Sequence, residues 1–389
     1  MNDSLPGRPR ILFLFSDTGG GHRSAAEAII EALGIEFDDL IATQMVDIFK
    51  EYAPRPLNIV PELYPKMARL PQAWGLGYKL SNGHYRSRLI TASAWPYVRH
   101  SIRNLIAQHP SELIVSVHPL ANAPVLHALG HIHAPFITVV TDLVTTHALW
   151  YHRRVDLCIV PTEMALQRAL MFGLREGQVR VVGLPVADRF CQTPGDRRVL
   201  RNRFGWPDDR LMVLLVGGGE GMGPLEETAH AVANSGLPIS LAIIAGRNKK
   251  LQARLRTAPW PAPTFVYGFV KEMPDFMRAA DVLVTKAGPG TISEALNAGL
   301  PMILYSRLPG QEDGNISYVV SEGAGVWAPH PDQIVSALSR WVKDPDKRLQ
   351  AVQACHRLAR PQAAREIAQI LASRVGIAKG IHQDFHHRN

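Results

Sequence analysis

Cysteine is scarce in this chain. The 389 residues include three cysteines, Cys158, Cys191 and Cys355, which are far apart and odd in number. Neither a CxxC pair nor a zinc-ligand spacing is present, so the sequence argues against a disulfide framework and a structural metal site. A reduced, cytoplasmic environment is therefore expected.

Long hydrophobic runs are also missing. A membrane-spanning helix needs about 20 consecutive apolar residues, whereas the longest candidates here, Pro135–Val140 and Leu211–Val216, have the length of strands. The N-terminus is polar, and Ile11–Phe15 is too short for the apolar part of a signal peptide. We therefore expect a protein that starts and stays in the cytoplasm unless it docks on a membrane.

Acidic residues are fewer than basic ones, 34 against 42, which gives a formal net charge of +8. Such a surface favours anionic partners, for example nucleic acid, anionic lipid or a phosphorylated substrate. Hydrophobic residues make up 46% of the chain and charged residues 20%, which excludes a disordered chain, a collagen and a coiled coil. At about 150 residues per domain, the length suggests two or three domains.

Short apolar runs alternate with helical patterns through the first half of the chain. A helical pattern extends over residues 22–33, with its small and apolar residues on one face. Continuous apolar runs are typical of a parallel sheet covered on both faces, so we predict a doubly wound α/β domain over residues 1–191. Its expected strands are Ile11–Phe15, Leu113–Val117, Phe136–Val140 and Leu157–Val160.

A second α/β domain is predicted over residues 211–355, after a linker at 192–210 that is rich in proline, glycine and charge. Helices over 356–380 are expected to pack back towards the first domain, and the polar tail 381–389 to be disordered. Two doubly wound domains should hold a ligand in the cleft between them, at the carboxyl ends of their strands. The expected strands of the second domain are Leu211–Val216, Ile239–Ile244, Val282–Val284 and Met302–Leu304.

The segment Lys50–Arg103 interrupts the α/β alternation. It lacks a clear buried strand and mixes tyrosine and tryptophan with an excess of lysine and arginine. An insertion of this length in a compact domain is usually functional, and this composition suits a membrane interface. The alternative is an ordinary helical hairpin whose aromatic side chains face the core.

Two glycine-rich turns follow predicted strands, and neither is a common nucleotide motif. The chain has no GxxxxGK[ST] sequence, and the glycines at 217–223 do not fit GxGxxG. The first turn, SDTGGGH at 16–22, frees backbone amides to point at a ligand. His22 then lies in the first helical turn, where the helix dipole disfavours its charged form and suits it to act as a general base. The alternative is a histidine that merely begins the helix.

The second turn, TKAGPGTISE at 285–294, opens a helix whose N-terminus can stabilise a diphosphate without a metal. Glu294 follows one turn later, where a carboxylate can bind two vicinal ribose hydroxyls; the alternative is a surface acid favoured by the helix dipole. The next predicted strand leads into PGQEDGN at 309–315. Its neighbouring amide and carboxylate groups suit the hydroxyls of a sugar.

Seven segments together resemble the monogalactosyldiacylglycerol (MGDG) synthase family of MurG-like, GT-B glycosyltransferases, in family 28. The resemblance extends over roughly residues 11 to 325, nearly the whole chain, and SDTGGGHR with KAGPGT and PGQE points to the galactolipid branch. The matching segments are SDTGGGHR (16–23), SVHPL (116–120), VVTDLVTTHALW (139–150), PTE (161–163), GGGEGMGPLEE (217–227), TKAGPGTISEA (285–295) and PGQEDGN (309–315).

The resemblance implies an α/β protein of the GT-B fold, with two doubly wound, Rossmann-like domains facing an interdomain cleft. The N-terminal domain would bind diacylglycerol and the membrane, and the C-terminal domain a UDP-sugar. The implied reaction is inverting transfer of a hexose, galactose favoured, to the 3-hydroxyl of 1,2-diacylglycerol. The implied partners are a UDP-sugar, diacylglycerol and anionic lipids at the cytoplasmic face of a membrane, with no nucleic acid, metal or cofactor.

The resemblance also assigns the donor-binding residues. Backbone at Phe269 and Val270 would contact uracil, Glu294 the ribose, and Gln311 with Glu312 the sugar. The remaining glycines and polar residues would hold the diphosphate or support the loops. The complete donor set is Gly217, Gly218, Gly219, Phe269, Val270, Lys286, Gly288, Gly290, Thr291, Glu294, Gln311, Glu312 and Asn315.

On the acceptor side, His22, with Asp17 or Asp142, would deprotonate the attacking hydroxyl. For His118 and His147 the alternative is a satisfied core histidine, since buried histidines are common enough. The residues that would border the acceptor are Gly20, Gly21, His118, His147 and Trp150.

One departure leaves the donor sugar open. Asp313 stands in the sugar loop where a smaller neutral residue is expected. Galactose and glucose differ in the orientation of one hydroxyl, and one hydrogen bond can decide between them. The alternatives are a UDP-glucose-dependent diacylglycerol glucosyltransferase, a transferase to another lipid-linked acceptor, and a basic lipid- or nucleic-acid-binding protein without activity.

Overall fold

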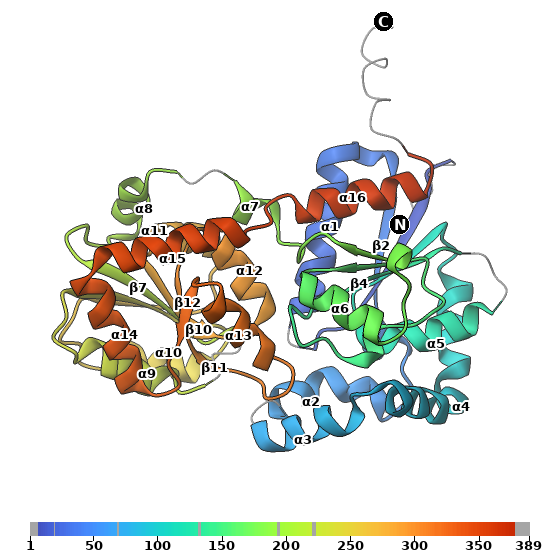
Figure 1. The fold of residues 1–389 in the computed structure, drawn as a ribbon, viewed down its shortest axis with the longest axis horizontal. Coiled ribbons are helices and arrows are strands. Elements are labelled where there is room, and N and C mark those ends of the chain that lie inside the picture. Colours follow the sequence, from blue (N-terminus) through green and yellow to red (C-terminus); the bar gives the residue numbers. More distant parts are fainter. Residues whose placement is uncertain are drawn as a thin grey trace, which may run out of the picture. The chain divides into compact units, whose positions relative to one another are not determined.

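The structure is a computed structural model that describes residues 7–18, 20–67, 70–130, 134–192, 195–219 and 223–377. The predicted disordered tail, 381–389, lies outside this range. The chain divides into two compact units, each with a parallel six-stranded sheet (Figure 1), which confirms the expected α/β class. Unit 1 contains the residues up to Met67, Gly75–Asp188 and those from Gln362 onward; unit 2 contains Arg189–Pro361 and 70–74.

Unit 1 is built on a sheet with the strand order β2-β1-β3-β4-β5-β6. All neighbouring strands are parallel, as between β1 and β3, where Ile11 is paired with Leu113. The central strands are buried almost throughout, because helices cover both faces. The strands are β1 (Arg10–Phe15), β2 (Ala42–Asp47), β3 (Leu113–Ser116), β4 (Phe136–Val139), β5 (Leu157–Val160) and β6 (Val179–Val181). The principal helices here are α1 (Gly21–Phe37), α5 (Pro119–Leu129), α6 (Glu163–Met171) and α7 (Asp188–Cys191), the last of which spans the boundary with unit 2.

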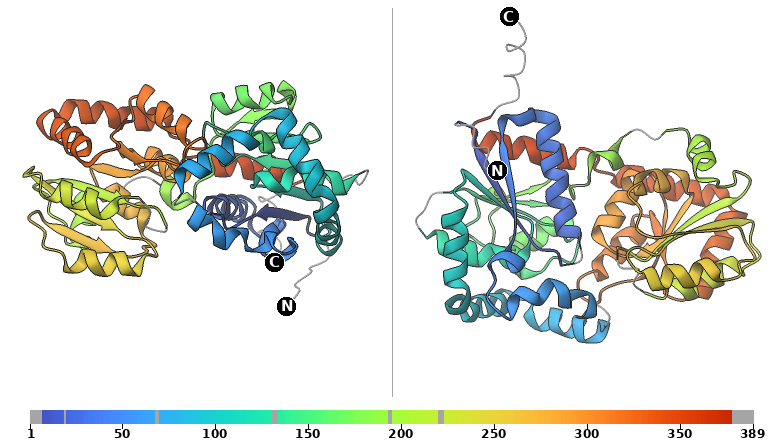
Figure 2. Two further views of the ribbon diagram at one scale, coloured as in Figure 1. Left: turned by 90° about the horizontal axis from the view of Figure 1, so that it is seen from below. Right: turned by 180° about the vertical axis from the view of Figure 1, so that it is seen from behind.

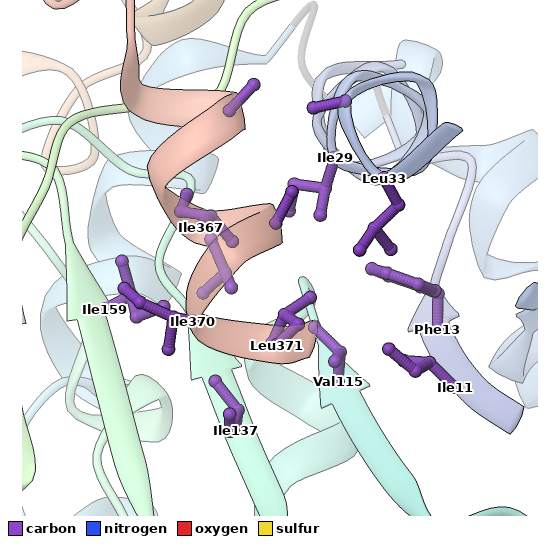
Figure 3. Close-up of a cluster of buried hydrophobic side chains, with 14 of the residues drawn as sticks. Ile11, Phe13, Ile29, Leu33, Val115, Ile137, Ile159, Ile367, Ile370 and Leu371 are labelled. Atoms are coloured by element: carbon purple, nitrogen blue, oxygen red, sulfur yellow. The ribbon is translucent and has the colours of Figure 1, made fainter. Parts of the chain in front are cut away.

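The last helix described, α16 (Ala363–Arg374), belongs to unit 1. Figure 3 shows Ile367, Ile370 and Leu371 of this helix pointing at the strands and at α1. These three side chains are at most 9% exposed. Burial of each such side chain contributes about 1.5–3 kcal/mol, so α16 is part of the core of unit 1.

Unit 2 repeats the plan with the strand order β12-β11-β10-β7-β8-β9. Its strands are β7 (Leu211–Val216), β8 (Ile239–Ile244), β9 (Thr264–Tyr267), β10 (Val282–Lys286), β11 (Met302–Ser306) and β12 (Gly325–Trp327). Its helices are α8 (Arg197–Phe204), α9 (Leu225–Ala233), α10 (Lys249–Thr257), α11 (Met273–Ala279), α12 (Pro289–Asn297), α13 (Asp313–Ser321), α14 (Pro331–Lys343) and α15 (Pro345–Leu358). The glycine turn and the sugar loop therefore follow β10 and β11, two neighbouring strands.

The prediction of a linker at 192–210 is wrong over the helix α8. Asp196 caps its N-terminus, and Gly205 ends it in the left-handed conformation, at φ 68°. Arg201 is buried and lies 2.6 Å from Asp281, whose Oδ2 also accepts a hydrogen bond from the amide of Met212. The charged residues that suggested a linker therefore belong to a helix that is held against unit 2 by ion pairs.

The insertion of unit 1 is helical. Its main helices are α2 (Val60–Met67), α3 (Pro71–Ser81) and α4 (His84–Gln108), which form a row in two views (Figures 1 and 2). The first four residues of α3 are grouped with unit 2. Several large apolar side chains are exposed on them, among them Leu76, Leu80, Tyr85 and Leu89. Within the described part of the chain, no helix combines the length and hydrophobicity required to cross a membrane.

Candidate functional site

The glycine turn after β1 places His22 at the start of α1. Gly20 has a φ of 80°, a left-handed conformation that glycine adopts readily. A Cβ atom added to Gly20 or Gly21 would meet nothing within 4 Å, so the turn borders open space. His22 is only partly exposed, and its side chain is positioned by groups from other strand ends.

Three groups surround the His22 imidazole. Its Nδ1 lies 2.7 Å from Oγ1 of Thr141, the second residue after β4. The ring of His118 lies edge-on at a centroid distance of 4.6 Å, and the ring of Trp150 is tilted at 6.0 Å. Burial lowers the pKa of His22 to about 4, against the opposing effect of a backbone hydrogen bond at Val117. The imidazole is therefore neutral at physiological pH and able to accept a proton.

Asp17 is held by two cations. Its Oδ1 lies 2.5 Å from Nε of Arg23 and its Oδ2 2.6 Å from Nζ of Lys50. The hydrogen bond from Arg23, together with that from Lys50, lowers the pKa of Asp17 to about 2, although partial burial acts in the opposite direction. Both oxygens of the Asp17 carboxylate are thus engaged by cations, and a role of Asp17 as the base stays a prediction.

Trp150 is fully buried in this structure, and its place beside an acceptor stays a prediction. Its indole Nε1 donates a hydrogen bond to Oδ2 of Asp142 at 2.6 Å, and Asp142 is itself 5% exposed. The indole thus uses its only polar atom inside the protein, as buried tryptophans usually do. Asp142 and Trp150 together support the wall behind His22.

His118 and His147 are both buried and hydrogen-bonded, as in the alternative of satisfied core histidines. Nδ1 of His118 accepts from the amide of Leu120 at the start of α5, and its Nε2 lies 3.1 Å from Oγ1 of Thr18. Nδ1 of His147 likewise accepts from Leu149 in η4 (Ala148–Trp150), while its Nε2 lies 3.1 Å from Oγ of Ser81. The two rings therefore cap the N-termini of α5 and η4.

Acid should destabilise unit 1 through its buried and partly buried histidines. Burial lowers the pKa of His22, His147 and His152 to about 4, and that of His118 well below its usual value. An unfolded histidine binds its proton near pH 6.5, so the unfolded state binds more protons below that pH, and stability falls as the pH falls towards 4. Each unit of pKa difference is worth about 1.4 kcal/mol.

We therefore expect calorimetry to show a lower Tm at pH 5.5 than at pH 7.5, and a smaller difference in a His152→Gln variant. In unit 2, burial raises the pKa of Glu294 to about 7. This group stabilises the fold as the pH falls, and it does so equally in the wild type and in His152→Gln. Identical pH dependence in the two proteins would contradict the assignment for His152.

The donor residues lie on unit 2. Gly288 caps α12 through its backbone, Pro289 occupies the first turn, and no side chain caps the helix. A Cβ added to Gly290 would again meet nothing within 4 Å. The amides of Gly290 and Thr291 therefore begin a helix whose positive dipole end is available to an anion.

Glu294 lies one turn further along α12. Burial raises its pKa to about 7, while the nearby Arg189 acts in the opposite direction. The side chain is only partly exposed, unlike a solvated surface acid. Proton donors such as sugar hydroxyls would stabilise its ionised form.

The loop after β11 is held by several contacts. Oε1 of Glu312 lies 2.7 Å from Nζ of Lys286, and Oε2 accepts from the amide of Leu308 at 2.7 Å. Asn315 is buried and donates to the carbonyl of Ala287 at 2.9 Å, which links this loop to the turn before α12.

Asp313 is held within the same loop. It pairs with Arg307 and accepts a hydrogen bond from the amide of Gly310 at 2.9 Å. Gln311 lies between these anchored residues. Asp313 thus fixes the turn in which Gln311 stands.

Two residues of this site were missed in the sequence. Gly246 allows the loop after β7 to approach closely, because a Cβ there would lie 2.4 Å from the carbonyl oxygen of Gly219. Arg247 donates its amide to the same carbonyl at 2.9 Å and lies over the exposed ring of Phe269 at 4.7 Å. Only the position of Gly246, directly after the apolar run of β8, could have drawn attention to them. Of the residues that the structure describes, no three His, Cys, Asp or Glu gather as metal ligands.

Comparison with known proteins identifies the class. Among solved structures, the chain resembles S. aureus MnaA in its co-structure with UDP, at a TM-score of 0.64 and 16% identity over 95% of this chain and 97% of that one. It also resembles Acinetobacter baumannii MurG, at a TM-score of 0.59 and 14% identity over 94% and 100%. These similarities, with the two parallel sheets, define the GT-B fold of glycosyltransferases and confirm the expected fold class.

Sequence comparison defines the family. Residues 22–186 match the family described as monogalactosyldiacylglycerol (MGDG) synthase, and residues 212–367 the glycosyltransferase family 28 C-terminal domain. A probable MGDG synthase 2 of Oryza sativa subsp. japonica is 38% identical over 92% of this chain and 79% of the relative. MGDG synthase 1 of Arabidopsis thaliana is also 38% identical, over 92% of this chain and 70% of that protein. The chain belongs to the MGDG synthase family and is a glycosyltransferase.

The same comparisons contradict the expected cytoplasmic location and the attachment to a cytoplasmic membrane face. The relatives from rice and Arabidopsis are described as chloroplastic. The expectation rested on unpaired cysteines and on the lack of a long apolar run. Neither property distinguishes the cytoplasm from other reducing compartments, which is why the inference failed.

Proposed function

We propose that this protein transfers galactose from UDP-galactose to the 3-hydroxyl of 1,2-diacylglycerol, with inversion at the anomeric carbon. Membership of the MGDG synthase family supports galactosyl transfer to diacylglycerol. The observation that carries the proposal is on unit 2, where the ammonium of Lys286 at the end of β10, a helix N-terminus without a side-chain cap and the carboxyl of Glu294 follow one another along the chain. These groups match a diphosphate and a ribose in charge and hydrogen bonding.

The leaving group in this reaction is UDP, which departs as an anion. The amides of Gly290 and Thr291 at the start of α12 would stabilise the charge that develops on its diphosphate. Glu294 would accept hydrogen bonds from two ribose hydroxyls, and backbone at Phe269 and Val270 would contact uracil. Fixed donors of this kind lower the barrier because they need no reorganisation as the charge forms.

The attacking group is a primary alcohol, which is a poor nucleophile until its proton is removed. His22 would act as the general base, because its imidazole is neutral and beside the open space at Gly20 and Gly21. Thr141 orients the ring through the contact at Nδ1. Asp142 would act through Trp150, and Asp17 through Arg23, as supports of this wall.

One assay tests the proposed reaction. The protein is incubated with diacylglycerol in vesicles and, separately, with UDP-galactose and UDP-glucose, and the lipid product and its anomeric configuration are identified by mass spectrometry and NMR. A β-galactosyl lipid formed from UDP-galactose is expected. A glucosyl product alone would mean that the donor is UDP-glucose and not UDP-galactose. The absence of any lipid product would contradict the proposal.

Anionic lipid is a proposed partner of the insertion. The exposed apolar side chains of α3 and α4 include Leu76, Leu80, Tyr85 and Leu89. Basic residues occur between and beyond them in the sequence, including Lys79, Arg86 and Arg88, whereas Lys50 is engaged by Asp17. Exposed apolar groups with lysine and arginine are typical of helices that lie on an anionic membrane surface.

We expect binding to vesicles to increase with anionic lipid and to weaken with salt, because each basic residue at such a surface contributes about 1 kcal/mol. In a flotation assay, Leu80→Ser should bind less than the wild type. Leu349→Ser, a control for an equally hydrophobic exposed residue on α15, should bind like the wild type. Equal binding to neutral and anionic vesicles would contradict the electrostatic part of the proposal.

A further inference from the structure

A partly buried ion pair joins the end of β10 to the loop after β11 on unit 2. Nζ of Lys286, at the end of β10, lies 2.7 Å from Oε1 of Glu312, in the loop after β11. Glu312 is 2% exposed, and its Oε2 accepts a hydrogen bond from Leu308. Each oxygen of this carboxylate therefore already accepts a strong hydrogen bond from the chain, although the resemblance assigned Glu312 directly to the donor sugar.

The ammonium of Lys286 lies beside the glycines of the phosphate turn. A Cβ added to Gly288 would be 3.0 Å from Nζ of Lys286 and 3.9 Å from Oε1 of Glu312. A Cβ added to Gly218, in the loop after β7, would be 3.6 Å from Cε of Lys286. A diphosphate at the start of α12 would therefore attract the ammonium of Lys286, which is the group that Glu312 holds in this structure.

We propose that Lys286 and Glu312 exchange partners when the donor binds, and this inference rests on the proposed function. Lys286 passes from the carboxylate to an oxygen of the diphosphate. Glu312 keeps its hydrogen bond from Leu308 and accepts new ones from hydroxyls of the donor sugar. No covalent bond changes in this step.

The exchange distinguishes the intact donor from its product. A buried carboxylate that loses its ammonium partner is costly unless another donor takes its place. UDP-galactose supplies a phosphate for Lys286 and hydroxyls for Glu312, whereas UDP supplies the phosphate alone. The pair therefore favours binding of the intact donor over UDP, and its return after transfer favours release of UDP.

Glu312→Gln tests the exchange, because the amide oxygen of glutamine can still accept from Leu308 while the charge that holds Lys286 is gone. Isothermal titration should give a Kd for UDP about tenfold lower than in the wild type, the size expected for one charged hydrogen bond. The KM for UDP-galactose should rise by a similar factor. Discrimination between the donor and UDP should therefore fall about 100-fold.

Two further variants isolate the pair. Lys286→Met should weaken the binding of UDP and of UDP-galactose by the same factor. The double variant, Lys286→Met with Glu312→Gln, should bind UDP no more tightly than Lys286→Met alone, because no ammonium remains to be released. As a control, Glu322→Gln removes a negative charge at the end of α13, where Glu322 lies 3.6 Å from Arg357. Its Kd for UDP should equal that of the wild type.

Several outcomes would overturn the exchange. An unchanged Kd for UDP in a folded Glu312→Gln protein would mean that Glu312 acts on the sugar without releasing Lys286. A higher Kd would make Glu312 a fixed support of the ammonium. If Glu312→Gln does not fold, an unchanged UDP affinity in Lys286→Met overturns the proposal. Failure of the wild type to bind UDP would defeat the proposed function itself, which separates the two failures.

Discussion

Replacement of His22 by alanine is expected to lower kcat by about 10²–10⁴-fold, the usual contribution of a general base. The loss arises because the acceptor hydroxyl keeps its proton when it attacks. His22 belongs to unit 1, and its contacts are Thr141, His118 and Trp150, so the affinity for UDP should change little. Steady-state kinetics with UDP-galactose and diacylglycerol vesicles, together with titration of UDP, measure both quantities.

His152→Ala is a matched control for this prediction. Burial lowers the pKa of His152 to about 4, as it does for His22, but Nδ1 of His152 accepts from the amide of Arg154. Its kcat should remain close to that of the wild type. If kcat of His22→Ala falls less than about tenfold, another group is the base. If the affinity for UDP collapses as well, His22 contacts the diphosphate.

Replacement of Glu294 by alanine should raise the KM for UDP-galactose by about 10–100-fold, because up to two hydrogen bonds to a charged group are lost. The carboxyl lies in the first turns of α12, beside the amides that would hold the diphosphate. The effect should be specific to the ribose. In the wild type, UDP should bind more tightly than 2′,3′-dideoxyuridine diphosphate, whereas the variant should bind the two alike.

Glu322→Ala is the control for Glu294, since it removes a carboxyl from the end of α13 that pairs with Arg357. Its KM should be unchanged. Circular dichroism must show that Glu294→Ala is folded. A wild-type KM in that folded variant, or continued discrimination between the two nucleotides, would mean that Glu294 does not bind ribose.

The central strands were predictable because helices on both faces make them continuous apolar runs. β7 and β8 lie at Leu211–Val216 and Ile239–Ile244, as the pattern predicted. β2 was missed because it is an edge strand that includes Thr43 and Gln44 among its half-buried residues. β12 was missed because this edge strand of the sheet in unit 2 has three residues, too few to form a pattern.

The candidate site could be predicted only where a local signal exists. Glycine turns after strands identified the start of α1 and α12, because such turns free backbone amides. The contact of His22 with Thr141 joins positions 119 residues apart, and no local pattern specifies it. The burial of Trp150 depends likewise on Asp142 accepting its indole hydrogen, which requires the folded loop.

The helix α16 has a consequence for how this protein is made. The ribosome completes β1 to β6 before it begins the strands of unit 2, yet α16, which covers Ile137 and Ile159, is synthesised after those strands. At about 5–20 residues per second, the apolar side chains that α16 covers remain without this helix for on the order of 10 s. When residue 188 has just left the ribosome, the nascent chain contains every acceptor-side group, but the core of unit 1 still lacks α16. The half of the protein that is translated first is therefore the half whose core is completed last.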